Sequence, residues 1–277
     1  MDYQTNPQLQ LAFDFVQYTN TNIFLTGKAG TGKTTFLKNL RLQSPKRMIV
    51  VAPTGVAALN AGGVTIHSFF QLPFSPFLPN TVRNSENNFR FSNEKLKIIK
   101  SIDLLVIDEI SMVRADVLDA IDGVLRRYRR HNLPFGGVQL LMIGDLQQLA
   151  PVVKDEEWDI LRTCYNSPFF FGSRALAQTP YVGIELKHIF RQSNPEFIAL
   201  LNEVRENKLS AGSIDMLNKR FIPNFNPDTT DGYITLTTHN YQAKNLNDNK
   251  LASIKNPEHR FTATVKDDFP EYLYPND

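Results

Sequence analysis

One short segment near the N-terminus constrains the fold of this chain more than any other. Gly27–Thr34 reads GKAGTGKT and fits the pattern GxxxxGK[ST]. An apolar run at Ile23–Leu25 precedes it and predicts a strand, and Thr34–Leu40 follows with the character of a helix. A glycine-rich turn between a strand and a helix points backbone N–H groups inward, beside the positive end of the helix dipole. The segment therefore predicts a phosphate-binding loop, which we call the P-loop.

Three further continuous apolar runs predict the other strands of the same sheet. They are Met48–Ala52, Leu104–Ile107 and Val138–Ile143. Such runs are typical of parallel strands buried on both faces, and helical segments separate them. We therefore predict a doubly wound α/β sheet. With 277 residues, of which 42% are apolar, the chain has enough material for one complete domain and part of another.

Two carboxylates follow the second of these runs. Asp108 and Glu109 would stand at the C-terminal edge of the sheet, where doubly wound folds bind ligands. We predict that Asp108 and the Thr34 hydroxyl hold Mg²⁺, and that Glu109 accepts a proton from a water attacking ATP. Lys33 would reach the β and γ phosphates. The alternative for the acidic pair is a plain turn after a strand.

The loop after Val138–Ile143 carries a further candidate. Gln148 would hydrogen-bond the γ-phosphate or the attacking water; an ordinary surface loop is the alternative. We predict that Lys33, Glu109 and Gln148 are catalytic residues. The loop residues predicted to bind the nucleotide are Gly27, Ala29, Gly30, Thr31, Gly32, Lys33, Thr34 and Thr35.

Composition limits the remaining classes of function only in part. The 30 basic and 28 acidic residues leave a net charge of +2, which neither requires nucleic acid nor excludes it. Cys164 is the only cysteine, so an intramolecular disulfide or a cysteine-based zinc site is excluded. Met1–Leu9 lacks the order of a signal peptide, and no apolar run approaches the ~20 residues that span a bilayer. We expect a cytoplasmic, nucleoid-associated protein with no membrane segment.

Two stretches depart from the alternation of strands and helices. Leu72–Asn93 is rich in proline and phenylalanine and then in asparagine and serine, which predicts an insertion. After Arg191 a new series begins, which predicts the start of a second α/β domain. Its predicted helices are Pro195–Arg205, Ala211–Arg220 and Tyr241–Ile254, and its predicted strands Tyr233–Thr237 and Phe261–Val265. The predicted domains are 1–63 with 93–187, an inserted subdomain at 64–92, and a partial domain at 188–277.

Several motifs occur together and in a fixed order. Besides the P-loop they are Ala52–Ala58, Thr65–Ser68, Asp108–Ser111, Gly144 and Asp145 with Gln148 and Leu149, and Phe190–Gln192. This ordered set resembles the motifs of superfamily 1B helicases. With Pro134–Leu140, which reads PFGGVQL, the chain looks like a Pif-type (petite integration frequency) DNA helicase, related to the RecD group. The resemblance covers nearly the whole chain.

The resemblance implies an activity and two further nucleotide contacts. Such helicases have RecA-like domains and use ATP hydrolysis to move 5′-to-3′ along single-stranded DNA. Their partners are single-stranded and forked DNA, and they act in DNA repair, recombination and telomere maintenance. Arg191 would reach the γ-phosphate from the second domain, with an ordinary salt bridge as its alternative. Gln10 would read the adenine, although Gln8 is close enough to leave the register open. The resemblance also implies a monomer, and a nuclear or mitochondrial location in a eukaryote.

The same resemblance implies contacts with DNA. The residues concerned are Pro53, Thr54, Gly55, Thr65, His67, His239 and Asn240. Thr54 and Gly55 would equally suit a helix cap, and a lone histidine is more often structural. Phe74 and Phe77 of the insertion resemble a wedge that could stack on bases, or they form a small core of their own. For the basic run at Arg126–His131, a solvated helix end is preferred over a track for DNA phosphates.

One departure from the family raises alternatives. Nothing after Arg191 matches the last two helicase motifs, so we expect a fragment with an incomplete second domain. A nucleotide-gated module that binds single-stranded DNA without unwinding is therefore a second hypothesis. A third hypothesis is a P-loop ATPase that acts on RNA or protein.

Overall fold

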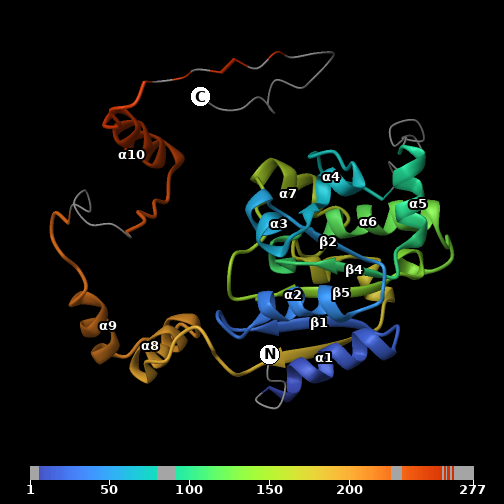
Figure 1. Cartoon of the computed structure of the whole chain (residues 1–277), viewed down its shortest axis with the longest axis horizontal. Helices are drawn as coiled ribbons and strands as arrows, with labels where there is room; N and C mark the ends of the chain where they lie inside the picture. The colour runs from blue at the N-terminus through green and yellow to red at the C-terminus, as the bar shows by residue number, and fades with distance from the viewer. Residues whose placement is uncertain are drawn as a thin grey trace. The chain divides into compact units, whose positions relative to one another are not determined.

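A six-stranded parallel sheet forms the centre of the computed structural model, which describes residues 6–79, 91–225, 233–257, 259, 261, 262 and 264. The strands are β1 (Asn22–Gly27), β2 (Met48–Ala52), β3 (Val64–Thr65), β4 (Leu104–Ile107), β5 (Gln139–Gly144) and β6 (Tyr181–Leu186). Their order is β3-β2-β4-β5-β1-β6, and every neighbouring pair is parallel. Figure 1 shows β2, β4, β5 and β1 side by side.

Helices fill the crossovers that parallel strands require. They are α1 (Pro7–Tyr18), α2 (Lys33–Gln43), α3 (Gly55–Ala61), α4 (Ile66–Phe70), α5 (Asn93–Ser101), α6 (Ala115–Tyr128), α7 (Asp155–Leu161), α8 (Pro195–Arg205), α9 (Ala211–Asn218) and α10 (Asn240–Ala252). Short 3-10 turns lie at η3 (Ile110–Met112), η4 (Pro134–Gly137), η5 (Phe170–Gly172) and η6 (Leu176–Gln178).

Apolar side chains pack on both faces of the sheet. Leu105 of β4 belongs to a core with the side chains of α4, α5 and α6. The next residue along the chain, Val106, belongs to a second core with α1 and α2. Because successive side chains of a strand point to opposite faces, this alternation places one core on each side. The predicted doubly wound sheet is therefore confirmed, and it is the scaffold that holds the loops described below.

The four apolar runs all form strands within one or two residues of their predicted bounds. β6 was not predicted from the sequence. Tyr233–Thr237 forms no strand, so that prediction is wrong: the segment has no regular secondary structure and forms no strand pair with the described residues, and Ile234 and Leu236 are exposed. At the predicted strand Phe261–Val265, the three residues that the structure describes also form none. The helices predicted after residue 194 are confirmed as α8, α9 and α10.

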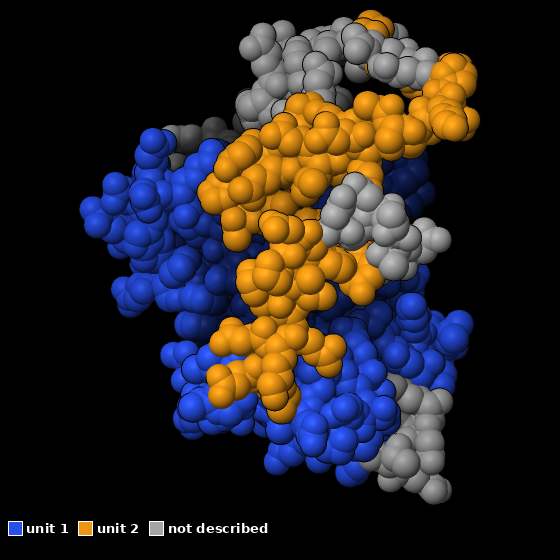
Figure 2. Space-filling model, turned by 90° about the vertical axis from the view of Figure 1, so that its left-hand side faces the viewer, with its two compact units in different colours: residues 1–214 blue, residues 215–277 orange. Residues whose placement is uncertain are grey.

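The chain divides into two compact units, Met1–Ile214 and Asp215–Asp277, which Figure 2 colours separately. This boundary lies inside α9, whereas the predicted second domain begins at residue 188; the domain assignment stays a prediction. Part of the predicted insertion, residues 80–90, lies outside the described residues. Within the described part, Phe77 packs against the core beside α6. No helix among the described residues is long and apolar enough to cross a membrane.

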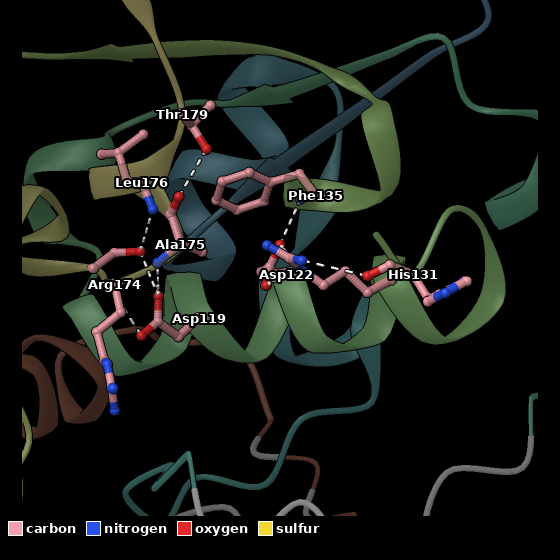
Figure 3. Close-up of polar contacts among 10 residues, drawn as sticks. Asp119, Asp122, His131, Phe135, Arg174, Ala175, Leu176 and Thr179 are labelled. Carbon is pink, nitrogen blue, oxygen red and sulfur yellow. Dashed lines mark hydrogen bonds and ion pairs between the residues drawn. The ribbon is translucent and has the colours of Figure 1, made fainter. Parts of the chain in front are cut away.

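A buried carboxylate on α6 connects this helix to the segment that leads into β6 (Figure 3). Asp119 accepts hydrogen bonds from the Tyr165 hydroxyl at 2.9 Å and the Ser173 hydroxyl at 2.5 Å. Its oxygens also accept from the backbone N–H groups of Arg174 at 3.2 Å and Ala175 at 3.0 Å. Four donors around one carboxylate satisfy its lone pairs without water. Asp119 therefore fixes the path of the chain between α6 and β6.

A second carboxylate on α6 fixes the turn before β5. The Phe135 N–H donates to Asp122 at 2.5 Å, and Arg126 pairs with the same carboxylate at 2.7 Å. Phe135 is fully buried, and Gly136 has a φ of 60° with the Leu125 carbonyl beside it. The PFGG stretch thus has a structural role at the entrance to β5.

The basic residues at the end of α6 also make structural contacts. Arg129 donates from Nη1 to the carbonyl oxygens of Ile99 at 2.9 Å and Lys100 at 2.6 Å. These carbonyls belong to the last turn of α5, whose acceptors lack partners within the helix. The solvated helix end preferred from the sequence therefore fits the exposed Arg127, Arg130 and His131, but not Arg126 and Arg129, which are half-buried and bind other groups of the protein.

Replacing Asp119 should destabilise the fold more than removing any single donor to it. Asp119→Ala leaves buried donors without an acceptor and should lower the free energy of unfolding by about 3 kcal/mol or more. Tyr165→Phe removes one hydrogen bond and should cost about 1 kcal/mol. Asp159→Ala is the control, since its ion pair with Arg162 is 62% exposed on both sides. Urea unfolding curves that place Asp119→Ala beside the control would contradict this account.

A second prediction concerns the turn before β5. In Gly136→Ala the added Cβ would stand 2.7 Å from the Leu125 carbonyl oxygen, at a φ of 60°. We expect a loss of about 1–3 kcal/mol of stability, because both the clash and the left-handed backbone disfavour alanine. Gly183→Ala, in β6, is the matched control because its Cβ meets nothing within 4 Å. Equal melting temperatures for the two variants would refute the structural role of Gly136 in this turn.

Candidate active site

The P-loop joins β1 to α2 and surrounds an open cavity. Gly30 and Gly32 have φ angles of 79° and 92°, a region that side chains other than glycine's rarely adopt. A Cβ at Gly30 would stand 2.5 Å from the Cβ of Arg191, so only glycine allows this close approach. The Lys33 ammonium donates to the carbonyl oxygens of Gly27 at 2.5 Å and Lys28 at 3.2 Å. These contacts hold the loop around the cavity.

The cavity has a volume of about 340 Å³ and a lining suited to phosphate. It is lined by Ala29–Thr35, Glu109, Gln148, Phe190 and Arg191. Gly32 caps α2 and offers no side-chain acceptor, so the first N–H groups of the helix stay available for a ligand. Backbone N–H groups, a helix N-terminus, an ammonium and a guanidinium together form a donor set that matches a polyphosphate.

Acidic side chains surround Lys33. Burial lowers the pKa of Lys33, while the nearby carboxylates of Asp145, Glu109 and Asp108 oppose that shift. Burial, and then the charge of Glu109, raise the pKa of Asp108 to about 6. The Glu109 N–H, which donates to Asp108 at 3.0 Å, and the charge of Lys33 oppose this rise. A buried carboxylate with so little compensation favours a nearby cation. The predicted acidic pair therefore lies within the electrostatic reach of the P-loop lysine.

Glu109 is held in an unusual backbone conformation. Its φ of 51° and ψ of 44° are left-handed, which costs a residue other than glycine of the order of 1–3 kcal/mol. The conformation begins the η3 turn, where the Met112 N–H donates to the Glu109 carbonyl at 3.0 Å. Strain of this kind clusters at functional sites, and here the strained residue lines the cavity.

The residues predicted to hold a metal fit a magnesium ion. Thr34 offers a hydroxyl from the cavity lining, and Asp108 offers a carboxylate after β4. Among the described residues there is no cluster of three or more metal-binding side chains. Mg²⁺ commonly uses one or two carboxylates and completes its coordination with phosphate oxygens and water. A hydroxyl and one carboxylate beside a phosphate cradle are such a donor set.

The sequence singled out Gln148 but not the residues that hold it. β5 lies between β4 and β1, so the loop after β5 reaches the middle of the site. There the Gln148 amide donates to Asp145 at 2.9 Å, and Arg205 of α8 binds the same carboxylate through both terminal nitrogens. Burial alone would raise the pKa of Asp145, but hydrogen bonds from Arg205, Gln147 and Gln148 lower it instead.

Two further contacts bring the start of the segment after β6 to the P-loop. The Phe190 N–H donates to the Gly30 carbonyl at 2.8 Å. Asn202 of α8 accepts from the Lys28 ammonium at 2.7 Å. Neither Asn202 nor Arg205 belongs to a recognised sequence motif, and arginine is common at the ends of helices. The sequence therefore offered no reason to select them.

The other predicted contacts are distributed as follows. Gln10 is half-buried on α1, donates to Asp14 at 2.7 Å and is not among the residues of the cavity lining. Its role in reading adenine stays a prediction. His239 and Asn240, at the start of α10, lie in the second compact unit, and their predicted contact with DNA is likewise open.

Three of the seven residues predicted to bind DNA, Pro53, Thr54 and His67, line a second cavity, of about 210 Å³. Its lining also includes Phe74. The His67 and Phe74 rings stack with their centroids 4.7 Å apart and an interplanar angle of 12°. Burial lowers the pKa of His67, and Arg114 in the same lining adds to the effect, against Asp116. An aromatic pair with a weakly basic imidazole thus forms one wall.

Both predicted threonines cap helices. The Thr54 hydroxyl accepts from the Ala57 N–H at 3.2 Å at the start of α3, where Gly55 is the first helical residue. The Thr65 hydroxyl accepts from the Ser68 N–H at 3.3 Å at the start of α4. The capping alternative raised for Thr54 therefore holds in the structure, Thr65 caps a helix as well, and the predicted contacts with DNA remain predictions.

Known proteins resemble this chain along most of its length. A human protein named ATP-dependent DNA helicase PIF1 is 33% identical over 271 residues, which cover 94% of this chain and 39% of that protein. A Saccharomyces cerevisiae protein of the same name is 33% identical over 253 residues, covering 87% and 28%. This chain thus spans well under two thirds of the curated relatives it matches.

Solved structures agree with these relatives. A crystal structure of Pif1 helicase from Bacteroides in complex with ADP-AlF3 and ssDNA matches with a TM-score of 0.85 and 42% identity, over 98% of this chain and 62% of that one. Pif1 helicase from Candida albicans matches with a TM-score of 0.73 and 32% identity, over 90% and 55%. The sequence model of PIF1-like helicases matches residues 9–212, more than half of the chain. The chain therefore belongs to the PIF1-like helicase family.

Proposed function

We propose that this chain is the ATP-binding and ATP-hydrolysing core of a DNA helicase that moves 5′-to-3′ on single-stranded DNA. One observation carries the proposal. The P-loop, Glu109, Gln148 and Arg191 come from four separate parts of the sequence and line one cavity. A plain phosphate-binding loop would require only the first of these.

Each of these groups has a distinct task in hydrolysis. Lys33 and the P-loop N–H groups hold the phosphates, and Arg191 neutralises charge that develops on the γ-phosphate. Glu109 accepts a proton from the attacking water, which Gln148 orients. A magnesium ion held by Thr34 and Asp108 would supply further stabilisation of phosphate charge.

Single-stranded DNA is the proposed polymer partner. The surface around Pro53, Thr54, Thr65 and His67 offers hydroxyl and N–H groups for phosphates, and Phe74 offers a ring for a base. The Bacteroides relative was solved with ssDNA, and another similar structure, 42% identical to this chain, concerns unwinding at forked dsDNA by two coordinating Pif1 helicases.

Several finer features belong to the same proposal. We propose forked DNA as a substrate of the whole protein, a monomeric core, and a partial second RecA-like domain after residue 187. Roles in DNA repair, recombination and telomere maintenance follow from the family, with a nucleoid location in a bacterium or a nuclear or mitochondrial one in a eukaryote.

Hydrolysis should depend on Glu109 and respond to single-stranded DNA. We expect Glu109→Gln to lower steady-state ATP hydrolysis about 100-fold or more while a fluorescent nucleotide still binds, because only proton transfer is removed. Glu156→Gln, an exposed change on α7, is the control and should behave as wild type. Hydrolysis that persists in Glu109→Gln would sink the proposal. ATPase stimulation by DNA without strand displacement would indicate a DNA-gated module, and stimulation by RNA would indicate another polymer.

DNA binding should depend on the ring of Phe74. Phe74→Ala removes a half-exposed ring stacked on His67 and should weaken binding of a single-stranded oligonucleotide about ten-fold, measured by fluorescence anisotropy. Tyr18→Ala is the control, since Tyr18 is 77% exposed and ends α1 shortly before the N-terminal end of β1, whereas the tested surface follows the C-terminal ends of β2 and β3. Equal affinities of the two variants would remove this surface from the DNA path.

A further inference from the structure

The Arg205 side chain reaches the middle of the candidate active site without being part of any motif. It is the last residue of α8, and its guanidinium binds Asp145, which follows β5. The side chains are 19% and 1% exposed. A pair so far removed from water is screened little, and its two-pronged geometry fixes both partners.

The carboxylate between them is shared with two groups of the loop after β5. Asp145 accepts from the Gln147 N–H at 3.1 Å through Oδ1 and from the Gln148 side-chain amide at 2.9 Å through Oδ2. An ionised carboxylate only accepts hydrogen bonds, so the NH₂ end of Gln148 must face it. The carbonyl end of Gln148, which can accept from a water, is left for the cavity that Gln148 lines.

The helix that carries Arg205 makes a second contact with the site. Asn202, three residues earlier on α8, accepts from Lys28 of the P-loop at 2.7 Å. Between β6 and α8, the Phe190 N–H donates to Gly30, and the Cβ of Arg191 lies against the same glycine. Arg191 at the cavity and Arg205 at the end of α8 are therefore the two ends of one segment, and both ends contact the site.

We propose that Arg205 is a positioning residue for ATP hydrolysis: through Asp145 it orients the Gln148 amide, and with Asn202 it holds α8, and hence Arg191, against the P-loop. This inference rests on the proposed ATPase function. A purely structural ion pair would stabilise the fold without a specific effect on turnover. The two accounts differ in what they predict for kcat, for nucleotide affinity and for the coupling between Arg205 and Gln148.

The test is a double-mutant cycle on the whole chain. Arg205→Gln should lower kcat for ATP hydrolysis about ten-fold, because misplaced groups lose rate steeply, while the affinity for a fluorescent ADP changes less than about two-fold. Gln148→Ala should lower kcat similarly, and the double variant should lose little more, since residues acting as a unit are not additive. Arg205→Lys keeps the charge but loses the fork and should recover only part of kcat.

Arg47→Gln is the matched control. Arg47 also binds an aspartate, Asp103, through two nitrogens, but that pair is exposed and belongs to the opposite end of β4. We expect wild-type kcat for it. Additive losses in the cycle, or an Arg205→Gln variant that melts earlier but keeps its kcat below the melting temperature, would overturn the inference.

Hydrogen exchange separates this inference from the proposed function. If the wild-type chain hydrolyses ATP no faster than Glu109→Gln, the proposed function fails for this chain. The protection of the backbone N–H groups of Gln147, Gln148 and residues 188–206 then tests whether Arg205 positions these segments. Loss of that protection in Arg205→Gln, with protection elsewhere unchanged, would support the arrangement; equal protection in both proteins would refute it.

Discussion

The place of β5 between β4 and β1 determines which side chains can meet at the site. In a parallel sheet all C-terminal strand ends lie along one edge, so neighbouring strands deliver neighbouring loops. The P-loop follows β1, and Asp108 with Glu109 follows β4, one strand further away. Asp145 therefore stands between the phosphate cradle and the acidic pair, and the electrostatic influence of all three carboxylates on Lys33 reflects this spacing.

Asp145 gives this central position its chemical meaning. Because hydrogen bonds from Arg205, Gln147 and Gln148 lower its pKa, it remains an acceptor beside the cavity, whereas the pKa of Asp108 is raised to about 6 by burial and by Glu109. Two aspartates at neighbouring strand ends thus have opposite shifts. The first is already compensated by protein donors, and the second is short of positive charge. This difference favours Asp108 over Asp145 as the ligand of a metal ion.

The parts of the fold that the sequence predicted are those with a local signal. Continuous apolar runs give β2, β4 and β5 because these strands are buried on both faces, and the glycine pattern gives the P-loop. β6 has a weak signal because it is half-exposed and contains Gly183. Tyr233–Thr237 shows the opposite error: it alternates like a strand, but strand formation depends on a partner, and none of the described residues provides one. The sequence did not indicate Arg205 because its role depends on an ion pair with Asp145, 60 residues away along the chain.

A capping hydroxyl can also bind DNA, so the two interpretations of Thr54 and Thr65 are compatible. A hydroxyl has one hydrogen to donate and two lone pairs to accept with. Each cap uses the oxygen as an acceptor, from Ala57 at 3.2 Å and from Ser68 at 3.3 Å. The hydroxyl hydrogen is left over, so a phosphate oxygen could accept it without breaking the cap. The cap also restricts the rotation of the side chain, so a contact of this kind loses less conformational entropy on binding.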